Sequence, residues 1–264
     1  MNIIIEHLFI FFQISLMCLF LSLSGFLFKR LLLNNYDTKN FEENGFFGFI
    51  LISFLALFIN FLFPLNLFIN NIFFILIIYS GFKFKFFDQS IPKLFKYIFF
   101  SSIICYILFI YSNVNTPDAI LYHLPYSKII NEHKIIIGLT NIHPRFGHIS
   151  IFQYISSFFN NSVFNTNGLL IPLGCLVSFF FIFSFNLFVK SFKDLNTRIK
   201  SYFIFLILIF SFYSFNRYSG YGNDAQVHIY YFLTIIYLLD VFLVKDSVLN
   251  FKKLSLVCLF TFLI

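Results

Sequence analysis

The sequence predicts an all-α membrane protein, a bundle of about seven to eight transmembrane helices. Hydrophobic residues make up 59% of the 264-residue chain, charged residues make up 11%, and the mean hydropathy is +0.87. This composition lies far outside the range of soluble domains. The apolar residues also gather in blocks close to the roughly 20 residues that a helix needs to cross the hydrocarbon core of a bilayer.

Seven blocks meet or approach this length, and we expect one spanning helix in each. They are 8–28, 46–63, 65–82, 94–112, 167–189, 201–215 and 225–244. Pro64 separates the second block from the third and predicts a tight helical hairpin, because proline disfavours the helical conformation in the residue before it. A further apolar block, 254–264, has only 11 residues and is too short to span. We therefore expect a single membrane domain over residues 1–264, incomplete at its C-terminal end.

Lys and Arg residues are distributed unevenly between the loops. If residues 29–45 are cytoplasmic, alternation of the seven spans places 14 of them on that side and four on the other. Cytoplasmic loops usually carry the excess of positive charge, so the distribution favours this orientation. It also explains the net charge of +7 without a nucleic-acid partner. The loops 113–148 and 216–224 are then extracytoplasmic.

The loop 113–148 is the one long polar segment, and it holds four of the six histidines. Thr116 and Pro117 suit the start of a helix over about 117–131. This helix would place Asp118 and Tyr122 on one face, with His123 beside them, and Pro125 would bend or end it.

A cationic turn follows this helix. Gly138 and Gly147 permit unusual backbone angles, and between them lie Asn141, His143 and Arg145. Arg can hold two phosphate oxygens at once, and His can donate a hydrogen bond or a proton. This turn therefore suits a phosphate or pyrophosphate group. The next apolar stretch, 149–160, is too short to span, and we expect an interfacial or re-entrant helix.

The second polar segment ends with Asp224 and His228, which are four residues apart at the mouth of the 225–244 span. Ionisable residues near the start of a membrane helix usually face the bundle interior or a water-filled cavity. We therefore expect Asp118 and Asp224 to converge on one outward-facing cavity.

The run DAILYHLPYSKIINEHKIIIGLTNIHPRFGHISIFQY resembles the first outer loop of a group of uncharacterised polytopic bacterial membrane proteins. Those proteins are related in architecture to the GT-C glycosyltransferases, which use polyprenyl-phosphate sugars. The later GNDAQVHIYYF is similar to their second polar motif at a helix mouth. The likeness covers about 113–160 and 216–232. Asp118 departs from the GT-C pattern, because it follows the fourth span instead of the first and has no acidic neighbour.

The resemblance implies a GT-C-like enzyme of the bacterial inner membrane that transfers a sugar, with inversion, to a glycan or lipid acceptor on the outer face. Asp118 would be the catalytic base, and His143 and Arg145 would bind the departing phosphate. The other expected substrate-binding residues are Tyr122, His123, Asn141, Asp224 and His228. No cofactor is required by this chemistry, although a divalent cation shared with the phosphate is compatible with it.

Several alternatives stay open. Asp118 is also a suitable helix-start residue, and His143 and Arg145 also suit contacts with lipid headgroups. Asp118, His123, His143 and His148 are residue types that bind metals, but no regular metal-binding spacing joins them, so we predict no dedicated metal site. The alternative functions are a surface-polysaccharide polymerase, ligase or translocator, and a non-enzymatic transporter. A transferase requires the carboxylate of Asp118, whereas a translocator requires mainly the cations.

Overall fold

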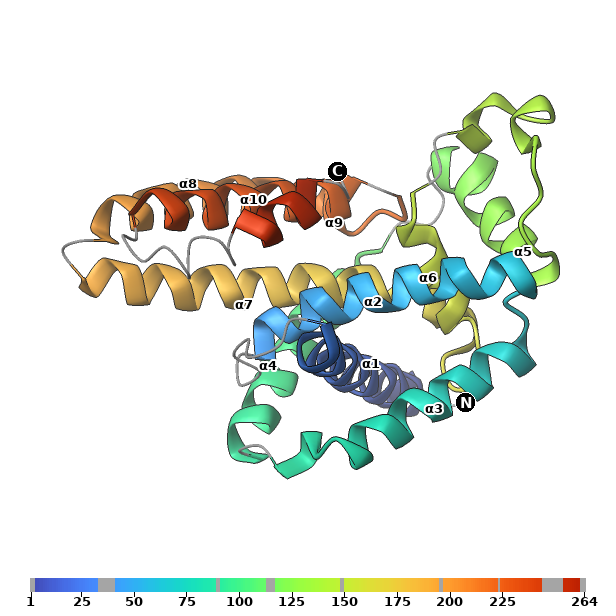
Figure 1. The fold of residues 1–264 in the computed structure, drawn as a ribbon, viewed down its shortest axis with the longest axis horizontal. Coiled ribbons are helices and arrows are strands. Elements are labelled where there is room, and N and C mark those ends of the chain that lie inside the picture. Colours follow the sequence, from blue (N-terminus) through green and yellow to red (C-terminus); the bar gives the residue numbers. More distant parts are fainter. Residues whose placement is uncertain are drawn as a thin grey trace.

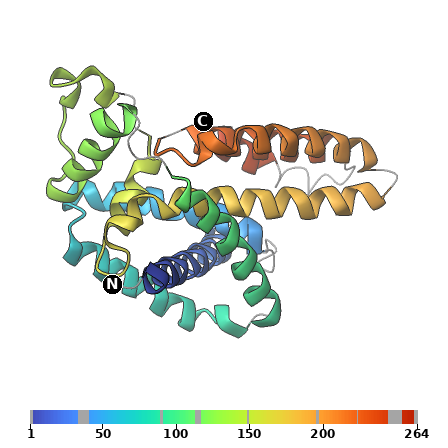
Figure 2. The ribbon, with the colours of Figure 1, turned by 180° about the vertical axis from the view of Figure 1, so that it is seen from behind.

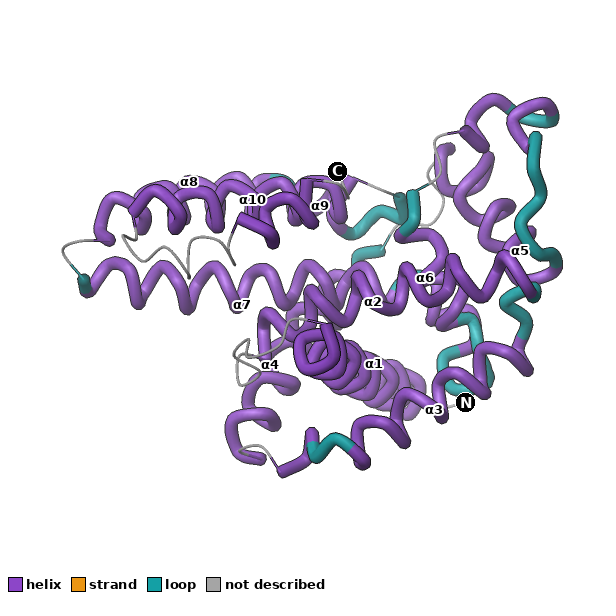
Figure 3. The backbone as a smooth tube through the Cα atoms, in the orientation of Figure 1, coloured by secondary structure: helices purple, strands orange, loops and turns teal. Residues whose placement is uncertain are grey.

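A computed structural model describes residues 3–32, 41–88, 91–112, 117–147, 150–194, 197–222, 224–243 and 254–261. Every regular element within these ranges is a helix (Figures 1 and 3). The long helices are α1 (Ile3–Leu32), α2 (Phe41–Leu62), α3 (Leu67–Lys83), α4 (Ile91–Ile110), α7 (Ile171–Lys193), α8 (Arg198–Tyr213) and α10 (Asp224–Leu243). The short helices are α5 (Leu124–Glu132), α6 (Phe152–Phe159) and α9 (Phe215–Tyr218). Residues 254–261 are also helical.

The seven predicted blocks coincide with the seven long helices, which confirms the all-α class. Five of these helices, α1, α2, α4, α7 and α10, are long and apolar enough to cross a membrane, and they indicate a membrane protein. Helices α3 and α8 have 17 and 16 residues, below the roughly 20 that a span perpendicular to the bilayer needs. The predicted count of seven to eight spans is therefore not confirmed.

The break predicted at Pro64 is present and reverses the chain, and we call this unit the α2–α3 hairpin (Figure 1). It is not the tight hairpin that was predicted, because the described residues of α2 and α3 make few contacts with each other and α3 packs on α1. Helix α2 ends at Leu62 and α3 begins at Leu67. The side chain of Asn66 caps α3, accepting a hydrogen bond from the backbone N–H of Ile69 at 3.0 Å. Such a cap satisfies one of the backbone donors that the first turn of a helix leaves unpaired.

Helices α1 and α2 pack with their backbones in direct contact at two glycines. A Cβ atom on Gly25 would lie 1.7 Å from the carbonyl oxygen of Asn44, and one on Gly48 would lie 1.8 Å from that of Leu21. Small residues allow this close approach, which is a main source of helix–helix stability inside a bilayer. The α1–α2 pair is the largest contact between elements of the bundle.

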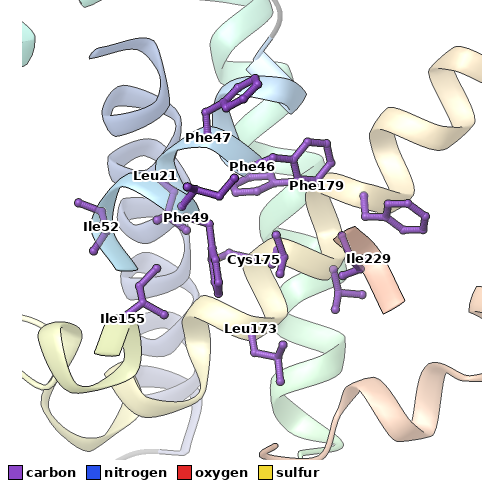
Figure 4. Close-up of a cluster of buried hydrophobic side chains, with 14 of the residues drawn as sticks. Leu21, Phe46, Phe47, Phe49, Ile52, Ile155, Leu173, Cys175, Phe179 and Ile229 are labelled. Carbon is purple, nitrogen blue, oxygen red and sulfur yellow. The ribbon is translucent and has the colours of Figure 1, made fainter. Parts of the chain in front are cut away.

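Helix α7 is the centre of the bundle and contacts α1, α2, α4, α8 and α10. In Figures 1 and 2, α7, α8 and α10 run side by side, whereas α1 is viewed nearly end-on. The core between α1, α2, α6 and α7 is built from large aromatic and aliphatic side chains around Phe49, Phe179 and Ile155 (Figure 4).

Helix α6 occupies the place of the interfacial or re-entrant helix expected over 149–160. All eight of its residues are buried, and it contacts α2, α5 and α7. It is therefore an interior helix of the protein and does not lie with one face on lipid. Its sequence, FQYISSFF, is amphipathic. Its polar face is covered as well as its apolar one, because Gln153 bonds to His123 and the Ser157 hydroxyl donates to the carbonyl of Ser127.

Candidate functional site

The described part of the polar loop, residues 117–147, forms a lobe beside the end of α2 (Figure 1). It contains α5 and three shorter elements, the π-helical turn η2 (Ala119–His123) and the 3₁₀ turns η3 (Leu139–Asn141) and η4 (Pro144–Gly147). We keep the name polar lobe for residues 117–147.

The single helix expected over 117–131 is divided into η2 and α5. The backbone N–H of Leu124 donates to the carbonyl of Ala119, five residues back, as in a π-helix. Pro125 follows as one of the first residues of α5, where a missing N–H is tolerated. Pro125 therefore does not end the helical segment, and the division falls directly before it, where the wider turn accommodates its missing N–H. Thr116, the expected N-cap, lies outside the described residues.

Arg145 joins the two ends of the polar lobe. Its Nη1 atom donates a hydrogen bond to Oδ1 of Asp118, forming an ion pair, and its guanidinium lies 5.5 Å from the centre of the Tyr122 ring. The side chains of Asp118 and Arg145 are 58% and 47% exposed, so the pair is open to a ligand. The predicted common face of Asp118 and Tyr122 is present, since one guanidinium contacts both.

His143 is oriented by the same short segment. Its Nδ1 accepts a hydrogen bond from the backbone N–H of Arg145 at 3.3 Å. In the neutral imidazole the proton is then on Nε2, which makes that atom a donor. Asn141 is exposed in η3, after Gly138, whose φ of 88° needs a glycine. The predicted cationic turn thus presents Arg145, His143 and Asn141 near one another on the lobe.

His123 points into the protein, unlike Asp118 and Arg145. It is 3% exposed, and its Nδ1 accepts a hydrogen bond from the side-chain amide nitrogen of Gln153 in α6. The amide oxygen of Gln153 is buried and has no hydrogen-bond partner within the described part of the chain. His123 also packs against the rings of Tyr122 and Tyr221, at 4.1 and 6.0 Å between centroids.

The second polar segment reaches the polar lobe through Tyr221. The Tyr221 hydroxyl lies 2.9 Å from the Ser127 hydroxyl, and a Cβ on Gly222 would lie 3.6 Å from Nε2 of His123. The segments 113–148 and 216–224 were both expected on one side of the bundle, and their described residues do meet. Neither Gln153 nor Tyr221 was predicted as a site residue, although each is a polar residue beside or within an apolar block.

Two tyrosines meet where α5 of the polar lobe packs against α6. The hydroxyl oxygens of Tyr126 and Tyr154 are 3.0 Å apart, and the Tyr126 ring also packs against Phe146 of η4. Burial raises the pKa of both hydroxyls, and the shared hydrogen bond raises that of Tyr154 further. Both tyrosines are therefore neutral hydrogen-bonding groups at physiological pH.

Asparagine side chains attach the lobe to the α2–α3 hairpin. The amide nitrogen of buried Asn60 donates to the carbonyls of Ile130 and His133, at 3.2 and 2.9 Å. Asn131 in α5 donates in turn to the carbonyl of Leu65, between α2 and α3, at 2.6 Å. The two Asn60 bonds satisfy carbonyls at the end of α5 that the helix leaves unpaired, and the Asn131 bond connects α5 to the turn of the hairpin.

Asp224 and His228 were expected at the mouth of the last span. Helix α10 begins at Asp224, but the position of the Asp224 side chain lies outside the described residues, as does any approach to Asp118. His228 packs among the rings of Phe210, Tyr218 and Phe232, with centroids 5.8 to 6.3 Å away. Its surroundings are thus aromatic.

Metal-binding residue types are not gathered in the described ranges, where no three His, Cys, Asp or Glu side chains are placed to hold one ion. His148 lies outside these ranges.

Comparison with known protein families gives one match, and it covers residues 8–264. The chain belongs to the family described as a domain of unknown function, DUF8201. No curated protein and no solved structure matches the chain. The family description of DUF8201 names no activity, so the polar lobe and its contacts are the basis for any functional argument about this member.

Proposed function

We propose that this DUF8201 protein is a membrane glycosyltransferase of the bacterial inner membrane, with the polar lobe on the outer face. It would transfer a sugar from a polyprenyl-phosphate-linked donor to a cell-surface glycan or lipid acceptor. The observation that carries the proposal is the ion pair between Asp118 and Arg145, which is exposed and lies beside Tyr122 and His143. A carboxylate beside cationic and donor groups is what this transfer requires.

The chemistry assigns a separate role to each side of the pair. The acceptor hydroxyl would lose its proton to Asp118 as its oxygen forms a bond to the anomeric carbon. The bond from that carbon to the donor phosphate would break on the opposite face, and the phosphate would keep the electron pair. Arg145 and Nε2 of His143 would stabilise the negative charge on the departing phosphate.

The described contacts leave atoms available for these roles. The ion pair uses Oδ1 of Asp118 and Nη1 of Arg145, so Oδ2 can receive the proton and further guanidinium N–H groups can bind phosphate. Asn141, on the same lobe, would add a hydrogen bond to either substrate.

The polar side chains packed around His123 support binding of a hydroxyl-rich group next to them. Gln153, Tyr221 and Ser127 place amide and hydroxyl groups next to the buried imidazole. Such groups recognise sugar hydroxyls, because a site with buried polar atoms discriminates strongly against partners that leave them unpaired. We assign Tyr122 and His123 to substrate binding on this basis, and keep Asp224 and His228 as residues of the second segment that approaches the lobe.

A surface-polysaccharide polymerase, ligase or translocator is the second candidate, and a non-enzymatic transporter the third. The exposed guanidinium of Arg145 and the imidazole donor of His143 would serve a translocator equally well, since such a protein only has to bind phosphate or an acidic glycan. Asp118 would then merely hold Arg145 in place. The role of the Asp118 carboxylate therefore separates the transferase from the second candidate.

The test uses a strain that lacks the gene, complemented with wild type, Asp118→Asn, Arg145→Ala or Glu132→Gln. Glu132 is the matched control, because it is an exposed carboxylate of the same lobe paired with Lys128 at 3.8 Å. Surface and lipid-linked glycans are compared by mass spectrometry at equal membrane levels of protein. We expect a sugar that is lost in the deletion strain to return with Glu132→Gln but not with Asp118→Asn.

General-base catalysis is typically worth about 10²–10⁴ in rate, so Asp118→Asn should leave only traces of product. If Asp118→Asn restored the glycan fully while Arg145→Ala did not, the translocator would replace the transferase. If the deletion strain had an unchanged glycan profile, both would be rejected in favour of transport of another solute.

A further inference from the structure

A long groove lies on the side of the bundle between α4 and the α7–α8 pair, away from the polar lobe. Its volume is about 960 Å³. The wall includes Phe100, Ile104 and Ile107 of α4, Phe181 of α7 and Phe212 of α8. Several of these side chains are exposed, among them Phe100 at 48% and Phe212 at 67%. The groove therefore opens sideways, in the direction in which the spanning helix α4 would face lipid.

The groove has the length of a lipid chain. Its lining follows α4 from Lys93 to Ile107, which corresponds to about 21 Å at a rise of about 1.5 Å per residue. Half of the hydrocarbon core of a bilayer measures about 15 Å, so the tail of a lipid from one leaflet fits within this length. The wall between its ends is apolar, as a hydrocarbon tail requires.

One end of the groove is positively charged. Lys93 and Lys96, on the first turns of α4, both line it and are both exposed. Neither lysine has an ion-pair partner among the described residues, whereas Lys29, Lys128, Lys200 and Arg145 each have one. Among the side chains that the structure describes, none of those lining the groove is acidic. Asn186 of α7 adds an amide to the lining.

We propose that this groove is a binding site for an anionic phospholipid. The phosphate would lie between Lys93 and Lys96, and one tail would lie along α4 against Phe181 and Phe212. Charge complementarity selects this occupant, because a zwitterionic lipid would bring a second, positive group to the two ammonium groups of Lys93 and Lys96. The site is separate from the Asp118–Arg145 pair and does not depend on the proposed function.

The test is native mass spectrometry of the full chain in neutral detergent, titrated with phosphatidylglycerol or with phosphatidylcholine of the same tails. A lysine near an anionic surface strengthens binding about 5-fold, so two lysines predict a preference for phosphatidylglycerol of about 25-fold. Lys93→Gln/Lys96→Gln should abolish the preference. Lys83→Gln/Lys85→Gln, which makes the same change of charge at exposed lysines outside the groove lining, should retain it.

Binding of the lipid tail is tested separately with Ile104→Trp. The larger side chain would fill the groove and should weaken the binding of both lipids. Soluble glycerol 3-phosphate, which has the headgroup chemistry without tails, should not compete. The proposal would be overturned by equal binding of the two lipids, or by competition from glycerol 3-phosphate. It would also be overturned if both lysine double variants lost the preference for phosphatidylglycerol to the same extent. Protection of the groove by a second copy of the chain, detected as a dimer that excludes lipid, would overturn it as well. Because the lysine variants are surface changes, their melting temperatures should equal that of wild type.

Discussion

Arg145 donates a hydrogen bond to Asp118 across 27 residues of chain, and in doing so closes the polar lobe into a ring. The pair is half-exposed, and exposed ion pairs contribute only about 0–1 kcal/mol to stability. Its effect on folding is therefore small. What the pair does is hold a carboxylate and a guanidinium at one place beside Tyr122, so variants at these two positions can be interpreted mainly through function.

Exchanging the charges of Asp118 and Arg145 distinguishes a structural role of the ion pair from a catalytic role of the carboxylate. Asp118→Arg/Arg145→Asp keeps an ion pair but moves the carboxylate to the other side of it. We expect normal membrane levels and a loss of product of at least about 10², as for removal of a general base. Arg145→Lys should retain part of the activity, since lysine keeps the charge but not the planar fork. Product is measured as glycan by mass spectrometry, and recovery of product in the exchanged variant would show that the pair is only structural.

Asn60→Ala should destabilise the protein through the lobe that it anchors. The substitution removes the side-chain donor to the carbonyl of His133 and one of two donors to that of Ile130, which also accepts from the backbone N–H of Leu65. A buried polar group left unpaired costs about 1–3 kcal/mol. The change is measured as the free energy of unfolding in detergent. Asn71→Ala is the control, because Asn71 bonds to Ser162 at an exposed position. If both variants had the same stability, the anchoring role of Asn60 would be wrong.

The buried ion pair between α1 and α2 predicts a different pattern. Lys29 is fully buried and lies 3.0 Å from Glu43, which also accepts a hydrogen bond from Tyr237 at 2.7 Å. Lys29→Met should destabilise the protein by about 3–5 kcal/mol, because it leaves a buried charge without its partner. Lys29→Met/Glu43→Met should recover most of this loss.

The comparison variant for this pair is Lys128→Met, which breaks the exposed Lys128–Glu132 pair and should cost less than about 1 kcal/mol. Unfolding by denaturing detergent gives all three values. If Lys29→Met and Lys128→Met lowered the free energy of unfolding by the same amount, the expected effect of burying the Lys29–Glu43 pair would be wrong.

The Tyr126–Tyr154 pair predicts alkaline sensitivity. Burial raises the pKa of both hydroxyls in the folded state. The stability contributed by a raised pKa is fully present below the unfolded value of about 10 and is lost as pH rises through the folded value. Unfolding free energy should therefore be flat through neutral pH and fall above about pH 10. Tyr126→Phe/Tyr154→Phe should show a smaller fall, measured by thermal unfolding across pH, and an identical pH profile would reject this assignment.

The sequence predicted the helices well because each is a block of apolar residues that needs no partner to be recognised. Pro64 likewise marked the α2–α3 turn, since its effect on the backbone is local. Asp118, Tyr122 and Arg145 could be grouped because glycines and prolines delimit the turns that carry them. The contacts of these three residues confirm that grouping, while their chemical roles stay predictions.

What could not be predicted is which distant side chains meet. Asn60 looks like any other asparagine within an apolar block, and only the fold shows that it reaches the end of α5. Gln153 lay within the segment expected as an interfacial or re-entrant helix, and nothing in that expectation pointed to its contact with His123. The ion pair of Lys29 with Glu43 was missed because both residues lie at helix ends, where charges usually meet solvent.

The asparagine contacts between the α2–α3 hairpin and α5 also bear on how the protein is assembled during synthesis. The hairpin, with Asn60 and Leu65, leaves the ribosome before residues 117–147 do. Its anchoring groups are thus already in the membrane when the lobe emerges, and the lobe can dock on arrival. In a circular permutation that placed the lobe first, the carbonyls of Ile130 and His133 would be synthesised before the side chain of Asn60 that donates to them. More of such a chain should therefore be degraded before it has folded.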